Sequence, residues 1–142
     1  MSKIVLCDVP NTLFDSRHRT HIAGVCQTNI LSDQINYTAL SLVKSLQKDG
    51  YIVVFTHYMH VRTRHLLLEL LRRYDLDRDS YIYTNFMNAG VFDNKTLKIK
   101  TYEHLMEEYG DVSLVIDNDE TMTAFWLDKG VGLLTTPLPI LR

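Results

Sequence analysis

The sequence begins with a short apolar run, Ile4-Val5-Leu6-Cys7, that leads into Asp8-Val9-Pro10-Asn11-Thr12. A short apolar run of this kind, followed by proline and asparagine, is typical of a buried strand that ends in a turn. In open α/β sheets, ligands bind at the carboxyl ends of such strands. The stretch therefore places Asp8 where α/β folds hold their ligands, although a single aspartate at the end of a strand more often serves as a turn or cap residue.

The rest of the chain alternates apolar runs with helical patterns. We expect further short strands at residues 51–55, 81–83, 112–116 and 131–134. We expect helices, several of them followed by a glycine, at residues 37–48, 59–74, 95–109 and 121–128. This alternation predicts a mostly parallel sheet with helices on both faces, which is a Rossmann-like three-layer sandwich.

Length and composition favour a single domain over residues 1–142. The chain is 46% hydrophobic and 23% charged, which is enough for one core and too little for two ordinary domains. Its formal net charge of -2 gives no general attraction to nucleic acid or to anionic membranes. Any site that binds an anion must therefore be local.

The cysteines and the amino-terminal residues bear on the cellular compartment. Cys7 and Cys26 form neither a disulfide framework nor a metal-ligand spacing. The apolar run before Asp8 is too short for a secretory signal, and no later apolar segment is long enough to cross a bilayer. We therefore expect a cytoplasmic protein without a membrane partner.

Three polar residues follow predicted strands. Asp8 follows the first, Thr56 the second and Asp117 the fourth. If these strands are neighbours in the sheet, the three side chains line one crevice at its carboxyl edge.

These positions resemble the haloacid dehalogenase superfamily of phosphohydrolases. The matching elements, in chain order, are Asp8 with Thr12, then Thr56, Lys98 and Asp117. The resemblance implies a Rossmann-like fold of the haloacid dehalogenase type with at most a minimal cap, because the segment 14–35 is long enough only for a small flap.

Within that superfamily, the chain most resembles the 3'-phosphatase domain of bacteriophage polynucleotide kinase-phosphatases and their small stand-alone relatives. Those proteins read Asp-x-Asp-Gly-Thr-Leu-x-Asp and then His-Arg-x-His, where this chain has Asp8-Val-Pro-Asn-Thr-Leu-Phe-Asp15 and His18-Arg-Thr-His21. Further matching positions are Asp33, Asn36, Lys98, Trp126 and Gly130. The resemblance covers almost the whole chain and implies a phage origin, with the host cytoplasm as the compartment.

The resemblance implies a role for each matched residue. Asp8 would attack phosphorus and form an aspartyl-phosphate, Thr56 would bind a phosphate oxygen, and Lys98 would hold the nucleophile. The implied cofactor is Mg²⁺, a cation that takes hard oxygen ligands. Its implied ligands are Asp8, the backbone carbonyl of Pro10, Asp117 and Asn118. The implied substrate-binding residues are Asn11, Thr12, His18, Arg19 and His57.

The chain departs from the family pattern around the same pocket. Pro10 replaces the aspartate that protonates the leaving group, although proline keeps the carbonyl that a metal needs. Asn11 replaces a glycine, a substitution that asparagine tolerates because it enters the left-handed region readily. His57-Tyr58 replaces a Gly-Arg pair, and Asn118 replaces the second acid of an Asp-Asp pair, with Asp119 beside it.

Two functions from different classes follow. The first is a metal-dependent phosphohydrolase in which another group, His57 or His18, acts as the acid, and whose substrate is a phosphorylated small molecule or a nucleic-acid end. The second is a pseudo-phosphatase that keeps the fold and binds a phosphate ligand, nucleic acid or a protein partner. Ordinary structural roles also stay open at this stage: His18 and Arg19 as surface residues, Lys98 as part of a solvated lysine face, and Trp126 as core.

Overall fold

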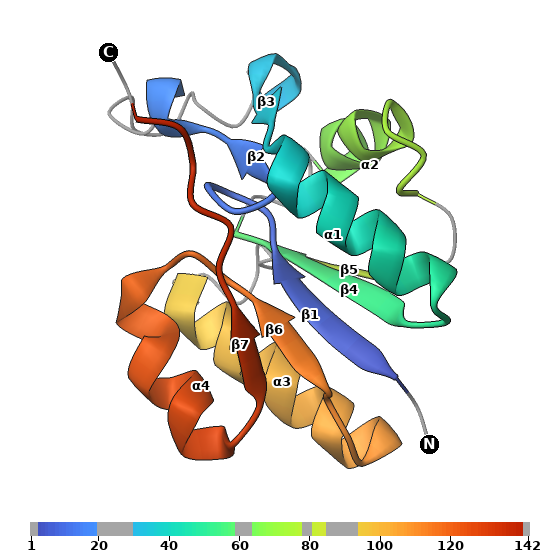
Figure 1. Ribbon diagram of the computed structural model, residues 1–142, viewed down its shortest axis with the longest axis vertical. Coiled ribbons are helices and arrows are strands. Elements are labelled where there is room, and N and C mark those ends of the chain that lie inside the picture. Colours follow the sequence, from blue (N-terminus) through green and yellow to red (C-terminus); the bar gives the residue numbers. More distant parts are fainter. Residues whose placement is uncertain (1–2, 20–29, 59–63, 78–80, 85–93, 141–142) are drawn as a thin grey trace.

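A computed structural model of the chain describes residues 3–19, 30–58, 64–77, 81–84 and 94–140 (Figure 1). Its centre is a five-stranded sheet in which every neighbouring pair is parallel. In spatial order, the strands are β5 (Tyr81–Thr84), β4 (Ile52–His57), β1 (Ile4–Asp8), β6 (Leu114–Ile116) and β7 (Gly132–Leu134). The strand that ends on Asp8 therefore lies in the middle of the sheet.

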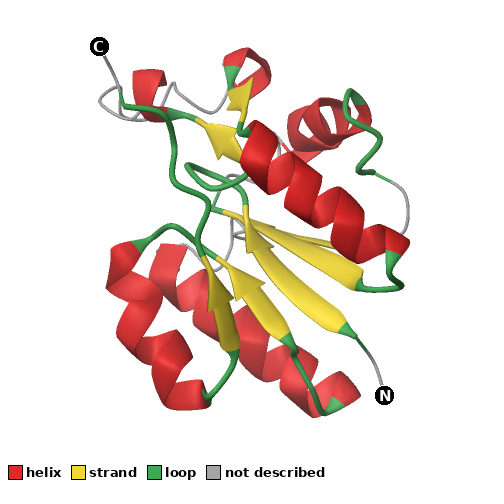
Figure 2. Cartoon of the chain, in the orientation of Figure 1, coloured by secondary structure: helices red, strands yellow, loops and turns green. Residues whose placement is uncertain are grey.

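Helices cover both faces of this sheet (Figure 2). The helices are α1 (Tyr37–Lys48), α2 (Arg64–Arg72), α3 (Asn94–Tyr109) and α4 (Thr123–Lys129). Alternate residues of β1 enter separate cores, with Val5 and Cys7 on the side of α1 and α2 and Ile4 and Leu6 on the side of α3 and α4. Burial on both faces explains why this strand is apolar throughout rather than alternating. The predicted α/β three-layer sandwich is confirmed.

Most element boundaries agree with the sequence patterns. Helix α1 has the predicted bounds, and Gly130 ends α4 in the left-handed conformation with a φ of 73°. The predicted start of α4 was wrong, because residues Glu120–Met122 form a separate 3-10 turn, η5. The Asp119 side chain accepts a hydrogen bond from the Thr121 N–H and so caps that turn. Residues 59–63 of the predicted second helix lie outside the described part of the chain.

A small antiparallel hairpin was not predicted as strands. It pairs β2 (Phe14–Asp15) with β3 (Gln34–Ile35), and the 3-10 turn η1 (Arg17–Arg19) follows β2. Strands this short carry no usable hydrophobic alternation, so the sequence pattern does not reveal them. The hairpin lies in the segment 14–35, where we expected no more than a small flap.

The chain continues beyond β7 as a segment without regular structure. Residues 135–140, which we call the C-terminal segment, run past the turn that follows β1 toward β2, as the red trace in Figure 1 shows. Among the described helices, none has the length and apolar character needed to cross a membrane.

Candidate active site

The strand order brings three predicted site residues to one edge of the sheet. β1 lies between β4 and β6, and Asp8 pairs in register with Thr56. Asp117 directly follows Ile116, the residue that pairs with Cys7. The expected convergence of these strand ends is confirmed, and Asp8, Thr56 and Asp117 are all buried.

The turn after β1 is tight and depends on Asn11. This residue has a φ of 61°, in the left-handed region that asparagine enters more readily than most residues. Its side-chain oxygen accepts hydrogen bonds from the backbone N–H and the hydroxyl of Ser16, at 2.9 and 3.0 Å. The expectation that asparagine tolerates this glycine position is confirmed.

Lys98 lies at the centre of a cluster of carboxylates. It extends from α3, is only 2% exposed, and places its Nζ 3.3 Å from Asp8 Oδ2. The same Nζ lies 3.1 Å from both carboxylate oxygens of Asp117 and 3.3 Å from Asp119 Oδ2. Burial alone would lower the pKa of Lys98, but the carboxylates of Asp8 and Asp117 outweigh it and raise that pKa. The ammonium is therefore held charged among acidic neighbours.

Asp117 has further partners that fix it in place. Its Oδ2 accepts a hydrogen bond from Trp126 Nε1 at 3.1 Å, and its Oδ1 accepts one from the Asp119 N–H at 2.9 Å. Trp126 belongs to α4 and packs in the core on that side of the sheet. The expected core role of Trp126 is confirmed, and the structure adds a hydrogen bond to the charged cluster.

Asp8 differs from the other acids of this cluster. Its Oδ2 accepts a hydrogen bond from the Thr12 hydroxyl at 3.1 Å, but its Oδ1 is buried and has no hydrogen-bond partner within the described structure. Burial raises the pKa of Asp8 to about 8, because Lys98 lowers it only in part and Asp117 adds a like charge. Buried polar atoms without partners are rare in native proteins and call for a specific explanation.

A cavity of about 230 Å³ adjoins this carboxylate. It is lined by Asp8, Pro10, Asn11, Asn94, Asn118 and Asp119. The side-chain oxygen of Asn94 is also buried without a hydrogen-bond partner in the described part of the chain. Our sequence reasoning missed Asn94. The available signal was its position four residues before Lys98, because residues with this spacing share one face of a helix.

The predicted substrate-binding histidines lie elsewhere. Thr56 pairs with Asp8 and shares its face of the sheet, so His57, the next residue of β4, faces the opposite side. His18 Nε2 lies 2.9 Å from Ser32 Oγ, in a different hollow of about 340 Å³. The side chain of Arg19 lies outside the described residues. Neither described histidine lines the cavity at Asp8.

Asn118 lines the cavity but bonds to backbone groups. Its Nδ2 donates to the carbonyls of Asn11 and Thr136, at 2.9 and 2.7 Å. Its Oδ1 accepts from the Thr136 N–H at 2.7 Å. The amide that we expected among the metal ligands is thus engaged with two other segments of the chain.

The donor set is compatible with Mg²⁺ when the substrate supplies part of the coordination. Within the described residues, no cluster of three or more His, Cys, Asp or Glu side chains is arranged to hold a metal alone. Mg²⁺ typically binds through one or two carboxylates together with water and substrate phosphate. Asp8 Oδ1 has no competing hydrogen bond, and Pro10 and Asp119 line the same cavity. These residues therefore fit the cation.

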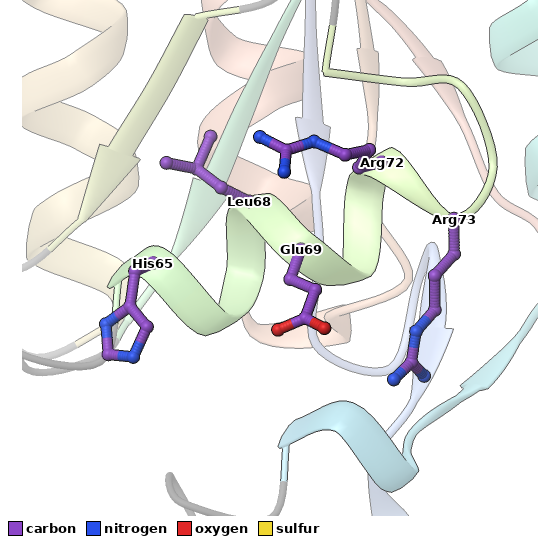
Figure 3. A pocket seen from close by; sticks show the side chains of 5 residues that line it. All are labelled: His65, Leu68, Glu69, Arg72 and Arg73. Carbon is purple, nitrogen blue, oxygen red and sulfur yellow. The ribbon is translucent and has the colours of Figure 1, made fainter.

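A larger hollow, of about 480 Å³, lies along α2 and shares none of its described lining residues with the cavity at Asp8. Figure 3 shows its side chains. Its described lining residues lie on α2 or directly after it, and they include Glu69 beside two arginines. Arg72 bonds to Asp77 at 3.3 Å and Arg73 to the Leu31 carbonyl at 3.0 Å. The arginines already have partners and the lining includes an acid, so this hollow is not a built site for an anion.

Comparisons with known proteins give structural matches only. No family model matches the sequence, and no curated protein matches it. One solved chain, from a "Pnkp1/Rnl/Hen1 complex", has 19% identity and a TM-score of 0.73, covering 99% of this chain and 48% of its own. Another, from the "Pnkp1/Rnl/Hen1 RNA repair complex", has 18% identity and a TM-score of 0.75, with 99% and 44% covered.

A third match is an apo phosphoserine phosphatase, with 13% identity and a TM-score of 0.57, covering 99% of this chain and 90% of its own. The chain therefore spans less than half the length of the first two matched chains. At these identities, the likeness concerns the fold. The chain has a Rossmann-like α/β fold, which it shares with these matched chains.

Proposed function

We propose that this chain is a metal-dependent phosphohydrolase that acts on phosphomonoesters through Asp8. The observation that carries the proposal is the hydrogen bonding of the two oxygens of this carboxylate. One of its oxygens is held by Thr12 and Lys98, while the other is buried, has no hydrogen-bond partner in the described structure, and belongs to a residue that lines a cavity. An unpartnered oxygen in such a place is ready to bond to phosphorus or to a metal.

In this proposal, an oxygen of Asp8 attacks phosphorus and forms a new P–O bond. The bond between phosphorus and the leaving oxygen breaks, and its electron pair departs with the leaving group. Water then hydrolyses the aspartyl-phosphate, releases inorganic phosphate and restores the carboxylate. Lys98 contacts Asp8 and offsets negative charge beside the reacting group.

Mg²⁺ would be held by Asp8, the carbonyl of Pro10 and Asp119, and it would reduce the repulsion between the carboxylate and the phosphate. Asp117, which the resemblance implies as a ligand, bonds to Lys98 and Trp126 and is not among the described lining residues of the cavity, whereas Asp119 is. We therefore propose Asp119 in place of Asp117.

Asp119 suits this role because its pKa is lowered. Burial acts in the raising direction, but hydrogen bonds from Thr121 and the charge of Lys98 outweigh it. An ionised carboxylate is a metal ligand rather than a proton donor.

The proposal includes a restriction on the leaving group. Among the described residues that line the cavity, Asp8 and Asp119 are the only ones with carboxyl groups, and position 10 is proline. A positioned general acid typically contributes about 10² to 10⁴ in rate. We therefore expect aryl phosphates, whose leaving group departs without a proton, to react much faster than alkyl phosphates such as a ribose 3'-phosphate.

For the physiological substrate class, we propose phosphorylated ends of nucleic acid or nucleotides. The support is the resemblance to polynucleotide 3'-phosphatase domains and the likeness of fold to chains of an RNA repair complex. The name of that complex also includes two other proteins, and we propose that this chain likewise works within an assembly.

A second candidate function is binding without turnover. The observation that favours it is Pro10, which lines the cavity at the position where the resembling family has its general acid. In this alternative, the site binds a phosphorylated ligand or supports a partner protein, and catalysis has been lost.

The test measures phosphate release with Mg²⁺ from three substrates: a 3'-phosphorylated RNA oligonucleotide, a nucleoside monophosphate and an aryl phosphate. Asp8→Asn is the control, since it keeps the shape of the side chain but removes the nucleophile. Pro10→Asp restores the missing acid. We expect aryl phosphate turnover that Asp8→Asn abolishes, and a gain of about 10² or more with the oligonucleotide in Pro10→Asp.

Turnover that persists in Asp8→Asn would contradict the assignment of the nucleophile. No turnover of any substrate, together with binding of the oligonucleotide that phosphate competes for, would favour the second candidate.

A further inference from the structure

Asn118 joins two segments that are far apart in the sequence. Its Nδ2 donates to the carbonyl of Asn11, in the turn after β1, and to the carbonyl of Thr136, in the C-terminal segment. The Thr136 N–H donates back to Asn118 Oδ1 at 2.7 Å. Both Nδ2 hydrogens and the amide oxygen are therefore used, and their short bonds are all to backbone groups. The Thr136 hydroxyl lies at 3.5 Å from Asn118 Oδ1.

Asn36 makes a similar connection from the other side. It occupies the N-cap position of α1, where an asparagine usually accepts a hydrogen bond from the first turn, but its side chain makes no cap bond. Its Nδ2 instead donates to the carbonyls of Thr12 and Thr136, at 2.9 and 2.7 Å. The side chain gives up a common local bond for two long-range ones.

Thr12 connects these amides to the nucleophile. Its hydroxyl accepts a hydrogen bond from the Asn118 N–H at 3.0 Å and donates one to Asp8 Oδ2 at 3.1 Å. Its carbonyl accepts from Asn36. The position of the Asp8 carboxylate thus depends on a turn that is held at Asn11 and Thr12 by the two amide side chains.

The C-terminal segment is fastened at a second point. Arg17 donates from Nη2 to the Pro139 carbonyl at 2.7 Å and pairs with Asp15 at 2.8 Å. Asp15 lies in β2, the short strand that follows the turn. The segment therefore crosses both the turn after β1 and the hairpin.

We propose that Asn118 and Asn36 are positioning residues that clamp the C-terminal segment onto the turn after β1 and thereby hold Asp8 in its working position. We call this set, Asn36, Asn118 and Thr136, the amide clamp. Asn118 then serves as a clamp rather than as a ligand of Mg²⁺. The catalytic part of this inference rests on the proposed function, whereas the clamp itself does not.

The chemistry of the partners explains why an amide is required at both positions. Each Nδ2 faces two carbonyl oxygens, which accept hydrogen bonds but do not donate them, and Asn36 Nδ2 also lies 3.3 Å from the Thr136 hydroxyl. An aspartate of nearly identical shape would offer no donor and would place negative charge against those carbonyls. Restoring an acid at position 118 should therefore loosen the site, whereas a metal-ligand role predicts that it strengthens Mg²⁺ binding.

The test compares Asn118→Asp and Asn36→Asp in the full chain. Gln47→Glu is the matched control, because it makes the same change from amide to acid in the last turn of α1, at the other end of the sheet. The measurements are hydrogen exchange of the Thr136 N–H, Mg²⁺ titration followed by NMR, and kcat and KM with an aryl phosphate. All are made well below the melting temperature of each variant, so that loss of global stability does not contribute.

We expect both clamp variants to lose protection of the Thr136 N–H by at least about tenfold, with no gain in Mg²⁺ affinity. We expect kcat to fall by about 10- to 100-fold in both, as is typical when groups that orient a site are removed. Gln47→Glu should match the wild-type protein in all measurements.

The inference is overturned if Asn118→Asp binds Mg²⁺ more tightly while the Thr136 N–H stays protected, or if Asn36→Asp leaves kcat unchanged. If the wild-type chain has no phosphatase activity, the proposed function fails, but hydrogen exchange still decides whether the clamp exists.

Discussion

The carboxylate cluster around Lys98 and the amide clamp meet at Thr12. These two polar networks differ in how many of their polar atoms have hydrogen-bond partners. Around Lys98, one ammonium contacts three carboxylates, and Asp8 Oδ1 has no hydrogen-bond partner among the described residues. In the amide clamp, every polar atom of the Asn118 side chain is bonded at 2.9 Å or less. A fully bonded network stabilises structure, whereas an unsatisfied buried atom is a cost that function explains.

This difference separates the residues that would react with substrate from the residues that hold them in place. In the cluster around Lys98, burial raises the pKa of Asp8 most, and the neighbouring Asp117 raises it further. The amide clamp contains no titratable group. We therefore expect substitutions in the cluster around Lys98 to change both stability and its pH dependence. Substitutions in the clamp that add no ionisable group should change position and exchange rates without that dependence.

The largest effect is expected from Lys98→Met, which leaves the carboxylates without their shared cation. Removing one partner of a buried ion pair typically costs about 3–5 kcal/mol, because the remaining charge is buried and uncompensated. Urea unfolding at pH 7 measures the loss, and phosphatase activity should disappear. Lys95→Met is the control, because Lys95 is exposed on the same helix. Equal stabilities for the two variants would contradict the role given to Lys98.

A smaller loss is expected from Thr12→Val, which keeps the shape but removes the hydroxyl where the two networks meet. The Asp8 carboxylate loses a donor and the Asn118 N–H loses an acceptor. Leaving buried groups unpaired costs about 1–3 kcal/mol. Thermal unfolding measures this loss, and Thr12→Ser, which keeps the hydroxyl, should recover most of it. If valine and serine behave alike, the hydroxyl does not connect the networks.

The pH dependence of the free energy of unfolding should reveal the raised pKa of Asp8. Its pKa is raised from 3.8 to about 8, so the folded state holds a proton that the unfolded chain releases. Its contribution to stability is complete below pH 4 and is lost as the pH rises through about 8. Asp8→Asn should therefore become more stable than the wild-type protein above pH 8, by at least about 1.4 kcal/mol, the equivalent of one pKa unit.

This comparison is made by urea unfolding between pH 4 and 9 with EDTA present, so that no bound metal contributes. A difference between the two proteins that stays constant over this range would show that Asp8 ionises normally.

The smallest effect is expected from His18→Asn. His18 bonds to Ser32 in a hollow separate from the cavity at Asp8, and its side chain is about half exposed. Surface substitutions usually stay within about 0.5 kcal/mol. Stability and kcat with an aryl phosphate should both be unchanged. A large fall in kcat, with a shift of the pH profile, would instead identify His18 as the missing acid.

The sequence was most informative where a structural position can be filled by only a few residue types. The continuous apolar run of β1 predicted a strand buried on both faces, and Asn11 predicted the left-handed turn. Lys98 was singled out by its match to the resembling family, and it is the residue that reaches the buried carboxylates.

The features that the sequence did not reveal depend on contacts between distant segments, which the spacing of residues along the chain does not indicate. Short strands such as β2 and β3 carry no periodic pattern. The partners of Asn118 come from a segment 18 residues later and from one 107 residues earlier. The face occupied by His57 follows only once the pairing of Asp8 with Thr56 is known.

The most direct test of the central claim is detection of phosphate on Asp8. The protein is mixed with Mg²⁺ and an aryl phosphate, quenched in acid within the first turnover, and digested with pepsin for mass spectrometry. We predict one added phosphoryl group on the peptide that contains Asp8, accumulating because Pro10 supplies no base to activate water. Phosphate release without this adduct, undiminished in Asp8→Asn, would contradict the account.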